Sequence, residues 1–193
     1  MLIPPNLLAP CIAQPNVFNQ DDFFDTACLE YINHLMDTEK SEYAWVGDQK
    51  KPKATDVRNT KNIIIEQHND SNYLYQTLMR RFVDANNRYF CYNLSMIYDV
   101  FLLKYEADNF YKAHLDIGGN ATNRKLSLIV QLSNENEYTG GDTLLHLSHE
   151  PVCINKKYNS ATFFPSYLLH EATPVFTGTR YALVSWATGE PFR

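Results

Sequence analysis

The second half of the chain alternates apolar and polar residues with a period of two, the spacing of strands that bury one face. Turn-forming Gly, Pro and Asn residues separate these stretches. The expected strands are Tyr92–Tyr105, Phe110–Asp116, Lys125–Ser133, Thr143–Leu147, Val152–Ile154, Ala161–Phe164, Leu168–Ala172 and Arg180–Trp186. Several short strands with frequent turns favour a mainly β fold with a jelly-roll core, also called a double-stranded β-helix.

The first half of the chain instead shows helical spacing of its apolar residues in two stretches. We expect the first helix to start near Gln20 with Asn19 as its N-cap, and the second to start after Ser71. Both apolar stripes are interpreted as core packing. The chain is therefore predicted to be a single domain over 1–193, with helical support at about 17–90 and the jelly-roll core at about 92–187.

Composition and charge exclude several classes of partner. The chain has 193 residues and a formal net charge of −5, which gives no general attraction to nucleic-acid phosphates. No segment approaches the ~20 apolar residues needed to cross a bilayer, and the N-terminus lacks the basic region of a signal peptide. We expect a cytoplasmic protein that binds neither nucleic acid nor membrane, and its oligomeric state is left open.

Four scattered cysteines form no CxxC pair, which argues against a zinc ribbon or a redox motif. Each lies among apolar or aromatic neighbours. We interpret all four as buried free thiols, in keeping with a cytosolic setting. They are Cys11, Cys28, Cys91 and Cys153.

The first chemical signal is the run His114-Leu115-Asp116. In an extended segment, side chains at positions i and i+2 point to the same face, so the imidazole and the carboxylate can converge on one metal ion. Such a pair also occurs as a surface hydrogen bond. On its own it does not decide between the two.

A third ligand can come from His170, which lies in a predicted strand near the C-terminus. In a jelly roll the first and the penultimate strands can lie side by side, which would bring His170 to His114 and Asp116. Two His and one carboxylate on one face of an octahedral ion form the facial triad of non-haem Fe(II) oxygenases. The three remaining positions can then take a 2-oxo acid and dioxygen.

Arg180 follows His170 by ten residues and leads into an apolar run. Facing sheets of a sandwich lie about 10 Å apart, so a dicarboxylate that chelates the metal could reach Arg180 on the opposite sheet. The planar guanidinium suits a carboxylate through paired hydrogen bonds. The alternative is an exposed arginine at a strand edge.

Two other features have less certain roles. The basic segment Gly47–Lys61 is either a solvated loop or a lid over a site. His146 and His149 follow a predicted strand, so a surface or substrate-facing role is favoured over metal binding.

The stretch Tyr105 to Trp186 resembles the catalytic core of the prolyl 4-hydroxylase-like branch of the 2-oxoglutarate dioxygenase superfamily. The resemblance rests on the order and spacing of several motifs. These are Tyr105, Phe110–Asp116, Arg124–Ser127, Tyr138–Leu144, Phe164–Ser166, His170, Thr173–Val175 and Gly178–Tyr181. They cover about 40 % of the chain.

The resemblance implies a role for each matching residue. His114, Asp116 and His170 match the iron ligands, and Arg180 matches the basic residue that binds the C5 carboxylate of 2-oxoglutarate. Tyr105 matches a tyrosine whose hydroxyl reaches the same carboxylate. Ser127 and Trp186 fall at positions that line this pocket, and Arg58 lies near the exit of a loop that closes over a peptide.

By the same resemblance, the chain is expected to be a dioxygenase that hydroxylates an unactivated C–H bond and decarboxylates 2-oxoglutarate to succinate. Fe(II), 2-oxoglutarate and O2 are its implied cofactor and co-substrates, with ascorbate as a reductant. The favoured substrate is a prolyl residue in a peptide or protein. The alternatives are a free amino acid or another small molecule, or a non-redox cupin-like metalloenzyme.

Overall fold

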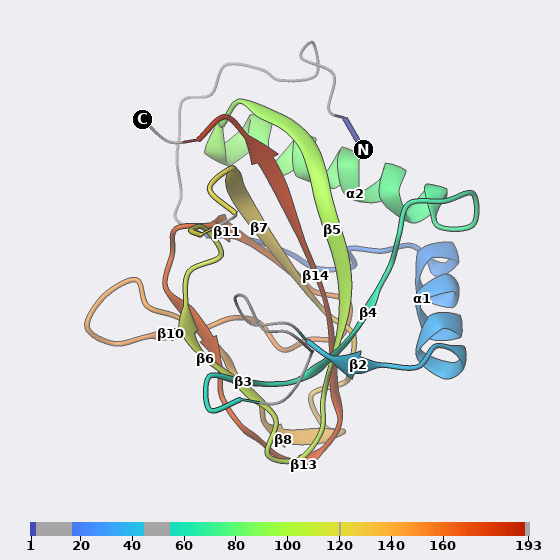
Figure 1. The fold of residues 1–193 in the computed structure, drawn as a ribbon, viewed down its shortest axis with the longest axis vertical. Helices are drawn as coiled ribbons and strands as arrows, with labels where there is room; N and C mark the ends of the chain where they lie inside the picture. Colours follow the sequence, from blue (N-terminus) through green and yellow to red (C-terminus); the bar gives the residue numbers. More distant parts are fainter. Residues whose placement is uncertain (3–16, 45–54, 120, 192–193) are drawn as a thin grey trace.

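The computed structural model describes residues 1–2, 17–44, 55–119 and 121–191, which form two facing β-sheets and a helical layer (Figure 1). The helices are α1 (Thr26–Thr38) and α2 (Asn72–Ala85), and a π-helical turn, η2 (Asn86–Phe90), follows α2. The strands are β1 (Phe18–Gln20), β2 (Glu42–Tyr43), β3 (Arg58–Asn59), β4 (Lys61–Ile64), β5 (Leu94–Tyr105), β6 (Phe110–His114), β7 (Arg124–Gln131), β8 (Tyr138–Gly140), β9 (Thr143–Leu145), β10 (Val152–Cys153), β11 (Ala161–Pro165), β12 (His170–Ala172), β13 (Val175–Gly178) and β14 (Arg180–Gly189).

The strands pair in an antiparallel sense throughout the described residues. The large sheet has the order β1-β11-β7-β14-β5-β4-β2, and the smaller sheet has the order β10-β9-β12-β6-β3. A third pair, β13-β8, lies where the chain turns between these sheets, at the bottom of Figure 1. Two facing antiparallel sheets built from short strands confirm the predicted mainly β fold with a jelly-roll core.

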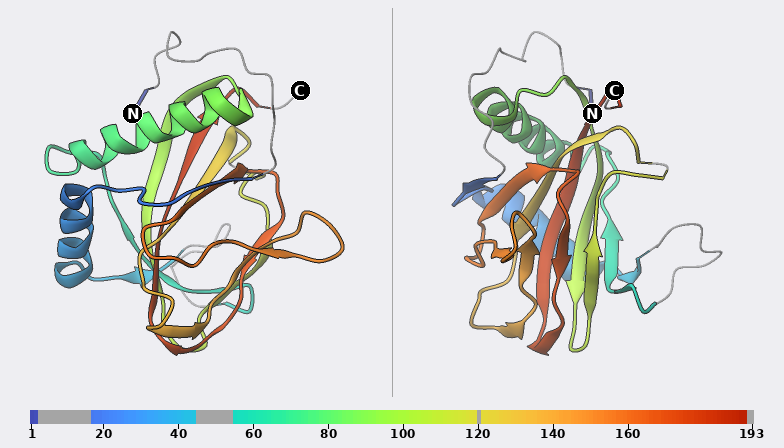
Figure 2. Two further views of the ribbon diagram at one scale, coloured as in Figure 1. Left: turned by 180° about the vertical axis from the view of Figure 1, so that it is seen from behind. Right: turned by 90° about the vertical axis from the view of Figure 1, so that its left-hand side faces the viewer.

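Strict alternation along β7 explains why the large sheet is buried on both faces. Leu126, Leu128 and Val130 share one core with the helices. Ile129 shares a second core with residues of the smaller sheet, such as Leu145. The views of Figure 2 show the helices on one side of the large sheet. The cavity described below therefore lies on the other side, between the sheets.

The start of the first helix differs from the sequence prediction. Helix α1 begins at Thr26, and the carboxylate of its N-cap, Asp25, accepts a hydrogen bond of 3.0 Å from the Cys28 N–H. Asn19, the expected cap, instead lies in β1 and pairs with Thr162 of β11. Both residue types favour caps, and the pairing of β1 with the sheet decided between them. The second helix begins after Ser71, as predicted.

All eight predicted strands are present, with ends that differ by a few residues. Six strands were not predicted, each of two to four residues: β1, β2, β3, β4, β8 and β13. Such short strands carry too few residues for alternation to be visible, because pairing with a longer neighbour is what makes them extended. Most of the basic segment Gly47–Lys61 lies outside the described residues; its end forms β3 and the first residue of β4.

The cysteines do not all match the expectation of buried free thiols. Cys28 is a buried free thiol, whereas Cys153 is free but exposed. Cys91 is disulfide-bonded, so the prediction is wrong for that residue. Cys11 lies outside the described residues. No helix in the described part of the chain is long and apolar enough to cross a membrane.

We predict that Gly140→Ala destabilises the fold more than Gly119→Ala. Both glycines have positive φ, 72° and 51°, which costs an alanine about 1–2 kcal/mol. At Gly140 a Cβ would also collide with the Pro174 carbonyl oxygen, whereas at Gly119 it would meet no atom within 4 Å. Urea unfolding of both variants measures the difference. Equal losses of stability would contradict the packing argument.

Candidate metal centre and cavity

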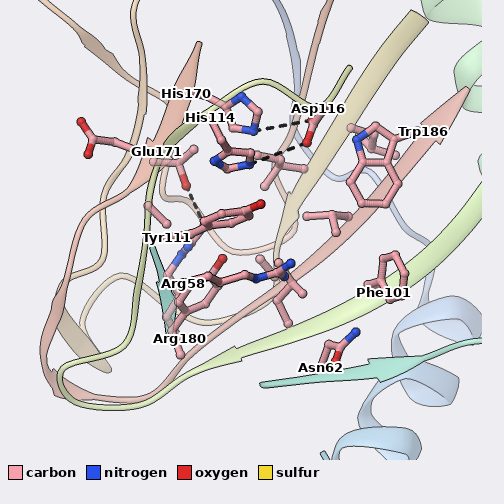
Figure 3. A pocket seen from close by; sticks show the side chains of 18 of the residues that line it. Arg58, Asn62, Phe101, Tyr111, His114, Asp116, His170, Glu171, Arg180 and Trp186 are labelled. Carbon is pink, nitrogen blue, oxygen red and sulfur yellow. Dashed lines mark hydrogen bonds and ion pairs between the residues drawn. The ribbon is translucent and has the colours of Figure 1, made fainter. Parts of the chain in front are cut away.

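The pairing of β6 with β12 brings the two predicted metal-binding histidines together. His114 is the last residue of β6 and His170 the first of β12, and the two are direct partners in the antiparallel register. Asp116 follows β6 and is held by a 3.1 Å hydrogen bond from its backbone N–H to the Ser166 carbonyl. Figure 3 shows the three side chains turned toward one another.

The three side chains offer a compact set of donor atoms. His114 Nε2 lies 3.7 Å from Asp116 Oδ1, and His170 Nε2 lies 3.5 Å from Asp116 Oδ2. One potential ligand atom from each residue lies within 4.8 Å of the others, and no other such His, Cys, Asp or Glu group occurs in the described residues. Two imidazoles and one carboxylate are the donors that a non-haem Fe(II) ion takes.

Backbone carbonyls fix the tautomer of both histidines. His114 Nδ1 lies 2.8 Å from the Lys112 carbonyl oxygen, and His170 Nδ1 lies 2.9 Å from that of Leu168. A carbonyl oxygen can only accept, so Nδ1 of each ring carries a proton. Nε2 is therefore the nitrogen of each ring that faces Asp116 and can serve as the metal ligand.

The charges of these groups at neutral pH also suit a divalent cation. Burial, together with the neighbouring His170, lowers the pKa of His114 to about 4, so its imidazole is neutral. Burial tends to raise the pKa of Asp116, but the two histidines and the Ser127 hydroxyl together lower it below its usual value. The centre thus combines a neutral His114 imidazole with an ionised carboxylate.

Ser127 supports the carboxylate from behind. Its hydroxyl donates a 2.6 Å hydrogen bond to Asp116 Oδ2 and lies 2.9 Å from the Ser166 hydroxyl. The sequence placed Ser127 in the wall of the pocket, but it is not among the residues that line the cavity. Its place behind Asp116 suggests that it holds the carboxylate in its orientation.

A cavity of about 320 Å³ extends from the three side chains across the space between the sheets. Arg180 of β14 lines it and is only 2 % exposed. Its Nε and Nη2 donate to Gln131 Oε1 at 3.2 and 3.1 Å, and Nη2 also donates to Thr143 Oγ1 at 2.9 Å. Arg180 makes no hydrogen bond through Nη1 and no ion pair within the described part of the chain.

A buried guanidinium with no carboxylate partner is costly, because desolvation disfavours its charge. An anionic ligand in the cavity would supply the missing charge.

Tyr105, which was predicted to contact the same carboxylate as Arg180, pairs with Arg180 in the β5·β14 register. Its ring centre lies 5.2 Å from the Arg180 guanidinium carbon, and it also lines the cavity.

Arg58, Tyr111 and His114 form a stack along one wall. The Tyr111 and His114 rings are stacked with centroids 3.5 Å apart, and the Arg58 guanidinium lies 4.4 Å from the Tyr111 centroid. The stack limits rotation of the His114 ring, in addition to the hydrogen bond at its Nδ1. Sequence reasoning placed Arg58 near a substrate loop but gave Tyr111 no role.

Arg124 and Trp186 form another part of the cavity wall. The Arg124 guanidinium lies 3.7 Å from the centroid of the Trp186 ring. Trp186 was predicted to line the pocket, and it does so.

Three residues that line the cavity or hold its arginine were given no role in sequence reasoning. Arg124 was quoted only as part of a motif, and Gln131 and Thr143 were not singled out. The sequence did contain a signal for Gln131. Alternation places it on the same, inward-facing side of β7 as Ile129, and a polar residue at an inward position is unusual.

The histidines His146 and His149 lie outside the metal group. His146 Nε2 lies 3.1 Å from a carboxylate oxygen of Glu171, and His149 is exposed. Neither belongs to the candidate metal group of the described residues.

We predict that Ser127→Ala weakens metal binding without unfolding the protein. Loss of the hydroxyl removes a hydrogen bond that orients Asp116 and lowers its pKa. Changes to groups that support metal ligands typically cost about 10–100-fold in affinity. Calorimetric titration with Mn(II) measures the loss, and Ser160→Ala, at another buried serine, is the control. Unchanged Mn(II) affinity in Ser127→Ala would refute this role.

Comparison with known proteins shows that part of the chain matches a described family. Residues 100–188 match the family model of the 2OG-Fe(II) oxygenase superfamily. A PKHD-type hydroxylase from Gloeothece citriformis is 28 % identical over 93 residues, which cover 47 % of this chain and 42 % of the relative. A PKHD-type hydroxylase from Prochlorococcus marinus is 32 % identical over 91 residues, or 47 % and 41 % of the two chains. The chain thus spans less than half the length of these relatives.

Solved structures share the fold across most of the chain. A prolyl hydroxylase from Trichoplax adhaerens, in complex with a peptide of hypoxia inducible factor, gives a TM-score of 0.74 at 16 % identity and covers 90 % of this chain and 83 % of that one. A prolyl-4-hydroxylase from Pseudomonas putida gives 0.72 at 16 % identity, with coverage of 91 % and 93 %. At this identity the likeness shows the fold alone.

The family match covers His114, Asp116, His170 and Arg180. The superfamily uses Fe(II), 2-oxoglutarate and O2, and the donor set and the buried cation of this cavity fit that requirement. These matches confirm the resemblance seen in the sequence: residues 100–188 match the 2OG-Fe(II) oxygenase superfamily, and the fold is shared with solved prolyl hydroxylases.

Proposed function

We propose that the protein is a 2-oxoglutarate- and Fe(II)-dependent dioxygenase that hydroxylates a prolyl residue in a peptide or protein. One observation carries the proposal. Three potential iron ligands and a buried arginine without a carboxylate partner line the same cavity in the described structure. This combination suits a ligand that binds a metal at one end and presents an anion at the other.

Within this proposal, His114, Asp116 and His170 hold Fe(II) and leave other positions for the co-substrates. Bound Fe(II) and O2 supply the oxidising power that decarboxylates 2-oxoglutarate to succinate and inserts oxygen into a C–H bond. Ascorbate serves as a reductant that maintains the ferrous state.

The residues of the chain bind, orient and exclude water. Arg180 binds the distal carboxylate through Nη1, because Gln131 and Thr143 already occupy Nε and Nη2. Tyr105 is proposed to contact the same carboxylate. Ile129 and Val184 add apolar side chains to the cavity wall, and apolar surroundings strengthen the interaction between opposite charges.

A peptide substrate is supported by the open side of the cavity. Asn62 and Ile64 of β4 and Phe101 of β5 line it. Ile64 is 55 % exposed, so the cavity wall continues to the surface at this edge of the large sheet. The structurally similar Trichoplax enzyme was solved with a peptide. A free amino acid or another small molecule is the alternative that the same opening allows.

A non-redox cupin-like metalloenzyme is less well supported. Such an enzyme could use the same three ligands, but it would have no use for a buried cation across the cavity. Arg180 therefore favours a dicarboxylate co-substrate.

The proposal predicts that Fe(II) and 2-oxoglutarate, added together without oxygen, give a visible metal-to-ligand charge-transfer band. With oxygen, ascorbate and a panel of proline-containing peptides, we expect succinate release and a peptide that gains the mass of one oxygen atom. Absorption spectroscopy and mass spectrometry measure these results. Protein that binds Fe(II) but shows no band would refute the dioxygenase, whereas a band with no peptide modified would favour a small-molecule substrate.

We further predict that Arg180→Met weakens 2-oxoglutarate binding but leaves Mn(II) affinity unchanged. Loss of a charge-assisted hydrogen bond costs about 1.5–3 kcal/mol, or roughly 10- to 100-fold in affinity. The ligand-free variant should be no less stable, because a buried charge without a carboxylate partner is removed. Titrations with each ligand and thermal unfolding measure these effects. Arg81→Met, which changes an arginine on α2, is the control; lost metal with retained 2-oxoglutarate would exclude this role.

A further inference from the structure

We propose that Ser166 is a positioning residue of the candidate metal centre. Its hydroxyl acts through Ser127 to hold the Asp116 carboxylate with Oδ1 directed toward the metal. This inference rests on the proposed function and deepens it, because it concerns how the centre is kept in the orientation that binds a metal. Ser166 is fully buried, follows the last residue of β11 and is not itself a candidate ligand.

The backbone of Ser166 joins three segments at the metal centre. Its carbonyl oxygen accepts hydrogen bonds from the N–H groups of Asp116 and Ile117, at 3.1 and 3.2 Å. Its own N–H donates to the Lys125 carbonyl oxygen at 3.0 Å, two residues before Ser127 in β7. Side-chain substitutions leave these backbone groups in place. Variants of Ser166 therefore isolate the contribution of its hydroxyl.

The direction of the hydrogen bonds between the side chains follows from charge. Ser127 Oγ lies 2.6 Å from Asp116 Oδ2 and 2.9 Å from Ser166 Oγ. An ionised carboxylate can only accept, and a serine hydroxyl has a single proton to donate. The Ser127 proton is committed to Asp116, so the bond between the two hydroxyls requires Ser166 to donate to Ser127. The result is a directed chain from Ser166 through Ser127 to Asp116.

This directed chain strengthens the hold on the carboxylate. A hydroxyl that accepts a hydrogen bond becomes a better donor, because the bonds of a chain polarise one another. The bond from Ser166 also restricts rotation of the Ser127 hydroxyl, which keeps its proton directed at Oδ2. Both serines are buried, so this chain is shielded from solvent.

The chain determines which carboxylate oxygen remains for the metal. Oδ2 is occupied by Ser127, whereas Oδ1 lies 3.7 Å from His114 Nε2, and Figure 3 shows the carboxylate turned toward both imidazoles. A carboxylate that binds through one oxygen leaves coordination positions for the co-substrates. The Trp186 side chain also hydrogen-bonds this carboxylate. Loss of the serine chain should therefore loosen Asp116 without releasing it.

The alternative is that Ser166 only fills space after β11. The two roles differ in how substitutions combine. A hydroxyl that acts through Ser127 has no effect once Ser127 has lost its own hydroxyl, whereas the loss of packing at Ser166 would add to that effect. A double-mutant cycle therefore separates the two roles.

The test measures Mn(II) affinity by calorimetric titration, with thermal unfolding to show that each variant is folded. We expect Ser166→Ala to weaken Mn(II) binding about 3- to 10-fold, the contribution of one neutral hydrogen bond. Ser166→Cys keeps a similar shape but donates weakly, so it should show a comparable loss. The double variant Ser127→Ala/Ser166→Ala should bind Mn(II) as tightly as Ser127→Ala alone.

A matched control and a spectroscopic readout accompany these titrations. Ser160 is also buried, but its hydroxyl donates to the Asn155 carbonyl oxygen, so Ser160→Ala should leave Mn(II) affinity unchanged. With Fe(II) and 2-oxoglutarate in the absence of oxygen, the charge-transfer band of Ser166→Ala should move to longer wavelength. A carboxylate that accepts a weaker hydrogen bond donates more charge to the metal, and Ser160→Ala should show no such shift.

Several results would overturn the inference. These are unchanged Mn(II) affinity in Ser166→Ala, full affinity in Ser166→Cys, losses that add in the double variant, an equal loss in Ser160→Ala, or a band that stays in place in Ser166→Ala. If Ser166→Ala does not fold, Ser127→Ala/Ser166→Cys provides the same cycle. Absence of the band in the unaltered protein would instead count against the proposed function, because the Mn(II) titrations need no 2-oxoglutarate.

Discussion

The antiparallel register that places His114 directly opposite His170 is the constraint on which the candidate metal centre depends. The side-chain period of a strand is two, so a slip of one residue in either strand would turn one imidazole to the other face of the sheet. Two further interactions maintain this register. Strand β12 also pairs with β9, and the Asp116 N–H donates a hydrogen bond to the Ser166 carbonyl oxygen. The ligand geometry is therefore a property of the whole smaller sheet.

The large sheet places the charged Arg180 side chain inside the protein. The helices cover one of its faces with a continuous apolar core, so that face is buried away from solvent. The other face supplies Arg180 from β14 and Gln131 from the adjacent strand β7. The candidate metal ligands and the buried cation thus come from opposite sheets, and the spacing of the sandwich sets the distance between them.

The sequence was most informative where a long periodic pattern or a set of spaced motifs was available. The eight longer strands, the second helix and the convergence of His114, Asp116 and His170 could be predicted. So could the inward direction of Arg180, because it precedes an apolar run. The start of α1 could not, since Asn19 and Asp25 are both good caps and only pairing with β11 distinguishes them.

Other features of the site depend on contacts between distant residues and leave no local pattern. Ser127 was expected in the wall, yet it supports Asp116 from behind because β7 faces the end of β6 at that point. The stacks of Arg58 on Tyr111 and of Arg124 on Trp186 join residues from separate strands. The disulfide state of Cys91 is likewise invisible in the spacing of four scattered cysteines.

The neutral oxygens around Arg180 have a consequence for molecules that resemble the expected co-substrate. Gln131 and Thr143 hold the guanidinium in place before any ligand arrives, so little conformational freedom remains to be lost. A 2-oxo acid without a distal carboxylate could still reach the metal. It would, however, exclude water from the Arg180 guanidinium without supplying a hydrogen-bond acceptor. If Arg180 binds the distal carboxylate as proposed, such analogues would be rejected by this penalty, which is larger than the discrimination that a missing apolar contact provides.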